Sequence, residues 1–191
     1  REIRGEWLRV QGLKPDPKHI GLASNRGQTM GAEGKFTMFR IEGDGASSEN
    51  VTFGNYCNID LEFPLLPRLN RKKRGEAIVQ AQLISCNSDK VVARNTRFVS
   101  RLNLCPFAGA ERALFDHCYF ESTDDALCGT GLYLGCTLVY YSSKPFYATQ
   151  GTGAVFLDCD FEVRTRNRQY FTKSDTPVAV VDSRFHHADA G

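Results

Sequence analysis

Two consecutive carboxylates at the end of a strand-like segment are the residues of this chain best suited to nucleophilic or acid–base chemistry. The run "ALFDHCYFE" is followed by "STDDALCG", which contains Asp124 and Asp125. On an alternating strand, Glu121, Thr123 and Asp125 share one face, whereas Asp124 points the other way. A carboxylate displayed on an outer face can attack a carbonyl or transfer a proton. The simpler alternative is that Asp125 only caps a turn.

Other reactive residue types lack the spacing that their chemistry requires. The four histidines have no triad context, and no serine lies in a GxSxG motif. The seven cysteines form no CxxC pair and no Cys/His spacing typical of zinc. No carboxylate cluster resembles a calcium site, so the sequence predicts neither a metal nor a cofactor. We interpret the cysteines as small buried hydrophobic residues; if one disulfide forms, we expect it to be Cys105–Cys128.

The composition is that of an ordinary globular chain. Its 191 residues include 41% hydrophobic and 24% charged residues, enough for a single domain over 1–191 with its own core. A net charge of +2 gives no broad basic field for nucleic acid. No apolar run approaches the roughly 18 residues of a membrane span. The opening "REIRGEWLRV" reads as a mature product or a segment of a longer chain.

A short repeat predicts the elements that position these residues. The pattern is apolar, any, apolar, any, small polar, Cys/Thr/Ser, any, apolar. It occurs as "VVARNTRFV", "ALFDHCYFE", "LYLGCTLV", "AVFLDCDFE" and "VAVVDSRFH". Its sixth positions lie 22, 18, 23 and 24 residues apart, at Thr96, Cys118, Cys136, Cys159 and Ser183.

This spacing favours a β-solenoid. Each unit alternates as a half-buried strand does, and its branched and aromatic residues favour strands over helices. Small sixth-position residues would stack from coil to coil as an internal ladder. A leucine-rich repeat would need leucine and asparagine spacings that are absent, and a propeller blade needs about 40 residues. We therefore predict an all-β, single-stranded, right-handed parallel β-helix that lacks its N-terminal coil.

The least regular stretch, residues 62–76, is predicted to be a loop that protrudes from the solenoid. It contains a basic run that either contacts a polyanionic substrate or is simply solvated. The same two interpretations apply to a second cluster, which alternates along one strand face. The two sets are Arg68, Arg71, Lys72, Lys73 and Arg74, and Arg164, Arg166 and Arg168.

Four segments resemble the pectin methylesterase family in order and spacing. Residues 36–55, "FTMFRIEGDGASSENVTFGN", are similar to the family's "TATFxVxGDGFxAxxITFxN". Residues 80–98 resemble "QAVALRV…DxxxFYNCRF", and residues 112–129 resemble "RQFYRDCYIEGTVDFIFG". The stretch "SSKPF" at 142–146 falls where the family has "LGRPW". The resemblance covers roughly residues 20–165 and implies a metal-free ester hydrolase with a β-helix fold.

The family's chemistry implies roles for individual positions. In the family, one aspartate attacks the methyl-ester carbonyl, a second protonates methanol and activates water, and glutamine amides stabilise the oxyanion. By resemblance, Asp125 is the nucleophile and Gln80 the first oxyanion donor. The alternative for Gln80 is an ordinary solvated side chain.

Three positions depart from the family pattern. Asn103 replaces the acid/base aspartate, and an amide has no titratable proton. Leu102 replaces the second glutamine. Lys144 replaces the arginine that orients the nucleophile; it keeps the charge but loses the bidentate fork, and it is otherwise surface charge.

Further residues are predicted to contact substrate. Phe107, Phe146 and Tyr147 are candidates for stacking against sugar rings, and Arg112 is a candidate substrate contact, or else a partner of Asp125 or of a neighbouring carboxylate. The sequence thus predicts a carbohydrate esterase of pectin-methylesterase type. The alternatives are a catalytically weakened β-helix that binds acidic polysaccharide and a purely structural module. We expect a monomer whose partner is acidic plant polysaccharide, and an extracellular or periplasmic location, inferred only from the substrate class.

Overall fold

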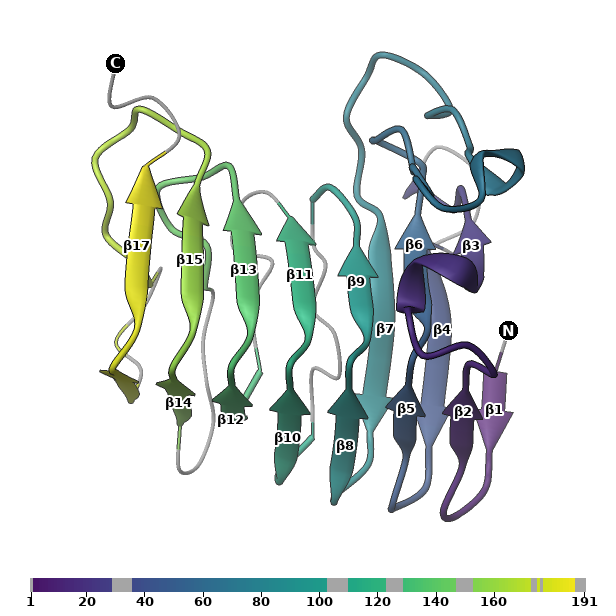
Figure 1. The fold of residues 1–191 in the computed structure, drawn as a ribbon, viewed down its shortest axis with the longest axis horizontal. Coiled ribbons are helices and arrows are strands. Elements are labelled where there is room, and N and C mark those ends of the chain that lie inside the picture. Colours follow the sequence, from purple (N-terminus) through teal and green to yellow (C-terminus); the bar gives the residue numbers. More distant parts are fainter. Residues whose placement is uncertain are drawn as a thin grey trace.

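Short strands that stack in register from coil to coil make up most of the molecule. The computed structural model describes residues 2–28, 36–102, 110–122, 129–146, 153–172, 175 and 177–187. Its named strands form three sheets, here sheets A, B and C, and all their pairings are parallel (Figure 1). Sheet A has the order β1-β4-β7, and sheets B and C each have seven strands.

The strand bounds show how briefly each strand runs. Sheet A contains β1 (Glu2–Arg4), β4 (Thr37–Glu42) and β7 (Gln82–Asn87). Sheet B contains β2 (Arg9–Gln11), β5 (Ser47–Glu49), β8 (Val91–Arg94), β10 (Ala113–Asp116), β12 (Gly131–Leu134), β14 (Ala154–Leu157) and β16 (Val178–Val181). Sheet C contains β3 (Gly21–Ser24), β6 (Thr52–Asn55), β9 (Arg97–Val99), β11 (Tyr119–Ser122), β13 (Thr137–Tyr140), β15 (Asp160–Val163) and β17 (Arg184–His187).

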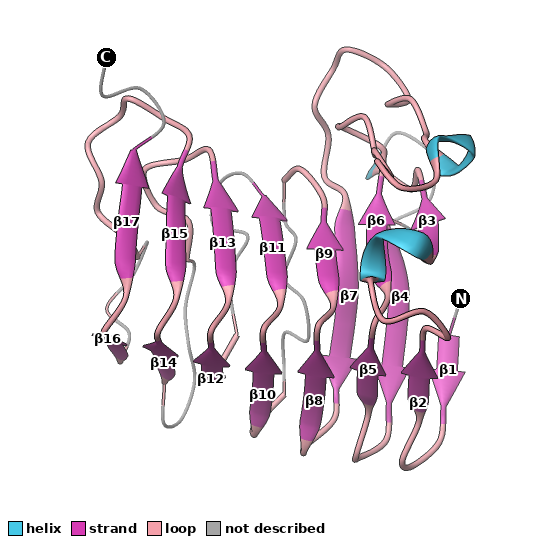
Figure 2. Cartoon of the chain, in the orientation of Figure 1, coloured by secondary structure: helices cyan, strands magenta, loops and turns pink. Residues whose placement is uncertain are grey.

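Each coil visits the sheets in the same sequence, which gives a right-handed parallel β-helix and confirms the predicted fold class. The first three coils contribute one strand to each sheet, and the described parts of the later coils contribute strands to sheets B and C only. The helical turns described are short 3-10 turns, η1 (Pro17–His19) and η3 (Pro67–Leu69) (Figure 2). In the described residues, no helix is long and apolar enough to cross a membrane.

The repeat unit folds as two strands rather than as the single strand expected. The chain turns a corner at the fifth position, so the first half joins sheet B and the second half joins sheet C. The corner residue takes a left-handed conformation, which asparagine, aspartate and glycine adopt at low cost. These corner residues have φ between 43° and 57°: Asn95, His117, Gly135, Asp158 and Asp182.

The internal ladder predicted from the sixth positions is confirmed. Cys118, Cys136 and Cys159 are at most 2% exposed and follow one another in successive coils. Their thiols donate to the carbonyls of Ala93, Phe115 and Tyr133 in the preceding coil, at 3.4, 3.2 and 3.4 Å. Burial raises the pKa of Cys136, so this thiol stays protonated and unreactive. The expected pair Cys105–Cys128 lies outside the described residues.

Aromatic rings fill the interior between the sheets. Phe53, Phe98 and Phe120 stack in successive coils with centroids 5.7 and 5.1 Å apart. A second column runs along sheet B, where Tyr133 stacks between Phe115 and Phe156 at 4.7 and 4.5 Å. These columns hold the coils in register, and they fix which residues of sheet C must point outward.

Residues 62–76 lie above β6 in Figure 1, and their base is anchored to sheet C. Leu61 pairs with Arg71 in an antiparallel bridge, and Phe63 is 1% exposed against Val99 and Tyr119. Two lysines of the basic run are already neutralised by nearby carboxylates, because Lys72 pairs with Asp60 at 2.6 Å and Lys73 pairs with Glu76 at 2.7 Å. The solvated interpretation therefore fits these two lysines better than substrate contact.

Candidate functional site

The outer face of sheet C brings chain-distant polar side chains into rows. Because side chains alternate, Phe98, Phe120 and Phe161 point inward and their neighbours point outward. The register aligns two outward rows along the solenoid, the first of which is Arg97, Tyr119, Thr137, Asp160 and Arg184. The second row is Val99, Glu121, Val139, Glu162 and His186.

Glu121 is the centre of a partly buried cluster on this face, which we call the Glu121 cluster: Arg101, Tyr119, Glu121 and Tyr141. Arg101 donates to Glu121 Oε1 at 3.0 Å, and the two side chains are only 18% and 15% exposed. Tyr119 donates to Oε2 at 2.9 Å, and Tyr141 donates to Oε1 at 3.4 Å. Both carboxylate oxygens are therefore occupied, which suits a group that orients its neighbours.

The two tyrosines and the arginine support one another as well as Glu121. The Arg101 guanidinium carbon lies 3.4 Å from the centroid of the Tyr141 ring, a close cation–π stack. Burial raises the pKa of Tyr119, and the charge of Glu121 raises it further. Burial also raises the pKa of Tyr141, with the charge of Glu121 acting in the same direction. Both hydroxyls thus remain donors at neutral pH.

Gln80 lies beside this cluster, as the pairing of its neighbours demonstrates. The Asn58 amide nitrogen donates both to Val79 O at 2.6 Å and to Arg101 O at 2.8 Å. The Ser100 hydroxyl donates to Ala81 O at 3.0 Å. The carbonyl oxygen of the Gln80 side chain is buried without a hydrogen-bond partner among the described residues. This oxygen is an acceptor, so a hydroxyl donor of a ligand could satisfy it.

The predicted nucleophile and its acid/base counterpart belong to segments that the structure does not describe. Asp125, Asn103, Phe107 and Tyr147 all lie outside the described residues. In the sequence, the segments that contain Asn103 and Asp125 begin four residues after β9 and directly after β11. Their convergence stays a prediction.

Lys144 is turned toward a neighbouring aromatic ring. Its ammonium nitrogen lies 5.3 Å from the centroid of the Tyr170 ring. The Tyr170 amide donates to the carbonyl of Ser143 at 2.9 Å, so the two segments are held together at the backbone. An ammonium over a ring is weakly held and can turn elsewhere, so the predicted orienting role of Lys144 remains a prediction.

Two predicted substrate contacts are corrected by their surroundings. Phe146 is 2% exposed and packs against Phe156, Phe161 and Phe171, so its ring offers no face to a sugar and belongs to the core. Arg112 pairs with Asp89 through its Nε and through its terminal nitrogen. Of its predicted roles, partner to a neighbouring carboxylate is thus the one that the geometry supports.

The pair Asp89–Arg112 joins two coils at the start of sheet B. The backbone amide of Arg112 also donates to Asp89, at 3.0 Å. The hydrogen bond from Arg112 is the main cause that lowers the pKa of Asp89 to about 2. Arg112 precedes β10, whereas the Glu121 cluster lies on β11 and beyond, so this ion pair is structural (Figure 1).

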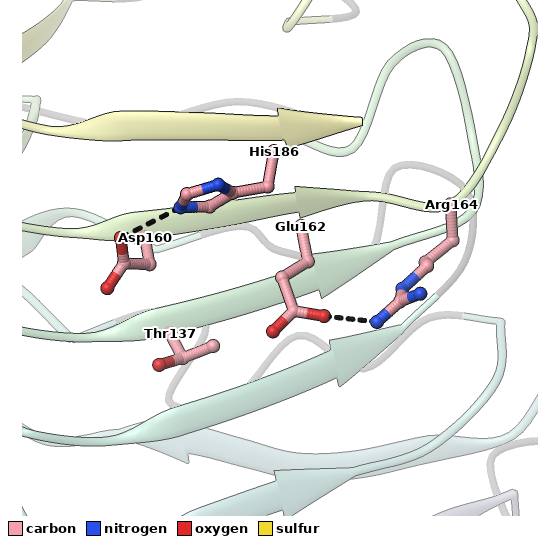
Figure 3. A pocket seen from close by; sticks show the side chains of 5 residues that line it. All are labelled: Thr137, Asp160, Glu162, Arg164 and His186. Carbon is pink, nitrogen blue, oxygen red and sulfur yellow. Dashed lines mark hydrogen bonds and ion pairs between the residues drawn. The ribbon is translucent and has the colours of Figure 1, made fainter. Parts of the chain in front are cut away.

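Sequence reasoning missed a hollow farther along the same face. It is lined by Thr137, Asp160, Glu162, Arg164 and His186 (Figure 3). Its charges are mutually paired: Arg184 donates to Asp160 at 2.8 Å, His186 lies 3.2 Å from the same oxygen, and Arg164 pairs with Glu162 at 2.5 Å. The Arg184 hydrogen bond, followed by that of His186, lowers the pKa of Asp160. The alternation of polar and apolar residues in "DFEVR" and "RFHH" was the sequence signal that could have predicted this hollow.

No part of this face gathers metal ligands in the described residues. Groups of three or more histidine, cysteine, aspartate or glutamate side chains placed to hold a metal ion are absent from that part of the chain. The two phenols of the Glu121 cluster already donate to Glu121, so they hold the carboxylate in place. The donors that remain are the Arg101 guanidinium, whose Nε has no hydrogen-bond partner among the described residues, and the nearby Gln80 amide. These two groups can bind an oxyanion or a carbohydrate carboxylate.

The fold and the site together define a right-handed parallel β-helix with a polar cluster on the outer face of one sheet. Among solved structures, the chain is similar to the rice weevil pectin methylesterase, with a TM-score of 0.56 and 10% identity, covering 97% of this chain and 81% of that one. It is also similar to the pectin methylesterase from Yersinia enterocolitica, with a TM-score of 0.53 and 12% identity, covering 97% and 84%. No protein-family model and no curated protein matches the chain. At such identities the likeness establishes a pectin-methylesterase-like fold and nothing finer.

Proposed function

We propose that the protein is a carbohydrate esterase that hydrolyses methyl esters of galacturonate in pectin, with Asp125 as the nucleophile. The observation that carries the proposal is the Glu121 cluster, in which Glu121 holds a partly buried guanidinium and two phenols in place on the outer face of sheet C. Glu121 belongs to β11, the strand that directly precedes the segment of Asp125 in the sequence. The sequence resemblance around residues 112–129 and the two pectin methylesterase neighbours support the same substrate class. An extracellular or periplasmic location would follow from that substrate.

The reaction has two steps. The Asp125 carboxylate attacks the ester carbonyl, the oxyanion is stabilised by the Gln80 amide, and methoxide leaves as methanol after taking a proton. Water then cleaves the resulting anhydride, which returns the Asp125 carboxylate and releases galacturonate. Because Asn103 has no proton to transfer, water must serve as the acid and the base. Positioned acid–base groups are worth about 10²–10⁴ in rate, so turnover should be slow.

Methanol release from methyl-esterified pectin tests this proposal. We expect slow release by the unmodified protein and none above background for Asp125→Ala. The neighbouring carboxylate provides a matched control. Alternation along the sequence predicts that Asp124 faces away from Asp125, so Asp124→Ala should retain activity. Release that survives in Asp125→Ala would remove this residue from the mechanism.

A second function, binding of pectic polysaccharide without hydrolysis, is favoured by two observations. Asn103 stands at the acid/base position, and the ammonium of Lys144 lies over Tyr170. Retention on immobilised polygalacturonate that weakens with added salt, together with no methanol release, would favour this function. Equal elution with and without the polysaccharide would eliminate it.

A further inference from the structure

A groove of about 760 Å³ adjoins the Glu121 cluster near the N-terminal ends of the sheet C strands β9 and β11. Its walls come from three chain-distant parts: residues 15–18 around η1, Pro64 of the segment 62–76, and the corner residues between sheets B and C. Small-molecule sites have volumes of about 300–1,000 Å³. The groove therefore has room for a sugar unit, and none of the functional roles assigned above uses it.

The walls are held in place by specific contacts. Asn95 donates to Pro15 O at 2.7 Å, and Thr52 donates to Pro17 O at 2.8 Å, which fixes η1 against the corner. On the other side, Pro64 follows Phe63, whose ring is 1% exposed and packs against Gly21. The groove is thus preformed, which lowers the cost of binding.

Arg97 places a cation at the base of the groove. Its guanidinium carbon lies 5.3 Å from the centroid of the Tyr119 ring, and one terminal nitrogen donates to Thr52 Oγ1 at 3.4 Å. Burial lowers the pKa of Arg97, although an arginine remains charged at neutral pH. The groove thus combines a partly desolvated charge with an aromatic face.

Arg97 differs from the other arginines on this face in its lack of a carboxylate partner. Arg101, Arg164 and Arg184 each pair with a carboxylate. Among the described residues, no carboxylate lies within ion-pair distance of Arg97. The oxygens of Glu121 already accept from Arg101, Tyr119 and Tyr141. The charges of Glu121 and Asp16 act on Arg97 from a distance, but neither carboxylate forms an ion pair with it. A partly desolvated guanidinium without a directly bonded counter-ion is a site for an anion.

We propose that this groove binds one acidic sugar unit, whose carboxylate pairs with Arg97 and whose ring lies against Tyr119 and the prolines. Guanidinium groups bind carboxylates through two parallel hydrogen bonds, and the apolar faces of a sugar ring suit aromatic and proline surfaces. Lys18 and His117 also line the groove, together with one carboxylate, Asp16, whose Oδ1 accepts from the backbone amide of Lys18 at 2.8 Å.

The groove and the candidate catalytic site share Tyr119. Its ring lines the groove, and its hydroxyl donates to Glu121 at 2.9 Å. A polysaccharide could therefore occupy both places at once. The binding itself requires no ester hydrolysis; only the choice of galacturonate as the acidic sugar rests on the proposed function.

Calorimetric titration with unesterified galacturonate trimer tests the groove without any reaction. We expect Arg97→Gln to weaken binding by about tenfold or more, because a charged hydrogen-bonding partner is lost. Arg94→Gln is the matched control, since Arg94 lies outside the groove and pairs with Asp116, and it should bind as the unmodified protein does. A neutral galactose trimer should bind at least tenfold more weakly than the acidic one.

Pro64→Glu provides a second variant, because Pro64 is exposed and its replacement leaves the core intact. The added carboxylate should repel the ligand and weaken binding to a similar degree. Trimer binding that is unchanged in both Arg97→Gln and Pro64→Glu, or absent from the unmodified protein, would overturn the groove proposal. Binding that depends on Arg97 in a protein that releases no methanol would support the groove and refute the proposed esterase.

Discussion

Arg101 and Glu121 illustrate how single residues on this surface are held. Both are under one-fifth exposed, and their charges meet at 3.0 Å. Glu162 and Arg164 make a superficially similar pair two coils farther along, but their side chains are 33% and 44% exposed. Water screens the second pair much more than the first. The Arg101–Glu121 pair should therefore contribute more to the stability of the fold than the Arg164–Glu162 pair.

Glu121→Gln should destabilise the protein by about 2 kcal/mol, because it leaves the partly buried guanidinium of Arg101 without a counter-charge. The matched change Glu162→Gln, at an exposed pair, should cost less than about 1 kcal/mol. Urea unfolding of the two variants measures the difference. Equal costs would contradict the structural importance that we assign to the Glu121 cluster.

Asp89 and Arg112 predict a dependence of stability on acid pH. The pKa of Asp89 is lowered from 3.8 to about 2, mainly by its hydrogen bond from Arg112. A lowered carboxylate pKa stabilises the fold above the unfolded value, and this stabilisation is lost as the pH falls from about 4 toward 2. Arg112→Gln should make unfolding less pH-dependent in that window. A variant with the same acid profile as the unmodified protein would show that the pair contributes nothing.

At the scale of elements, close packing adds to backbone hydrogen bonds in attaching the segment 62–76 to the solenoid. The ring of Phe63 covers Gly21 of β3, and a Cβ atom added at Gly21 would lie 2.4 Å from the ring carbon Cζ. Leu61 packs against Gly54 of β6 in the same way, because a Cβ atom added at Gly54 would lie 2.5 Å from a methyl carbon of Leu61. The glycines are therefore needed for space.

Gly21→Ala should destabilise the protein by about 1–3 kcal/mol, because the Phe63 ring must move away from β3. It should also open the groove beside Pro64 and weaken binding of the galacturonate trimer. Gly75→Ala is the control, since a Cβ atom there meets nothing within 4 Å. Thermal unfolding and the same calorimetric titration measure both effects. If Gly21→Ala changes neither the stability nor the binding of the trimer, the segment is not anchored through Phe63.

At the scale of the whole molecule, the position of a residue along the solenoid should set its contribution to stability. Phe120 and Phe185 occupy equivalent inward positions of sheet C, yet Phe120 is fully buried in a middle coil and Phe185 is 53% exposed in the last described coil. Each coil packs only on its neighbours, so the end coil has one partner fewer.

Phe120→Ala should therefore cost about 3–5 kcal/mol, as other buried phenylalanines do. Phe185→Ala should cost less than half as much, because half of its surface is already in contact with water. Denaturant unfolding of both variants, under identical conditions, gives the ratio. Similar costs at the two positions would indicate that the last coil is covered in solution by something else.

The solenoid could be predicted from the sequence because its repeat records the interior directly. Thr96, Cys118, Cys136 and Cys159 had to be small, and their spacing revealed the coil length. The two-sheet corner was missed because one left-handed residue, such as Asn95, leaves no break in the alternation.

The site was less predictable because its partners depend on side-chain direction. Alternation placed Glu121 on the outer face, but nothing in the sequence showed that Arg101 and Tyr141, from other coils, would meet it. Phe146 was misjudged because an aromatic residue in a loop has no periodic neighbours to reveal its burial. Arg112 was ambiguous because several carboxylates lay within reach of its long side chain.

We propose that chain-distant residues 103 and 125 meet beyond the Glu121 cluster to cleave an ester. Methanol release by Asn103→Asp, measured in the presence and in the absence of Asp125, tests it most directly. We predict that the restored carboxylate raises the rate by at least about tenfold and that the gain disappears entirely when Asp125→Ala is added. A rate that does not change, or a gain that persists without Asp125, would contradict the account.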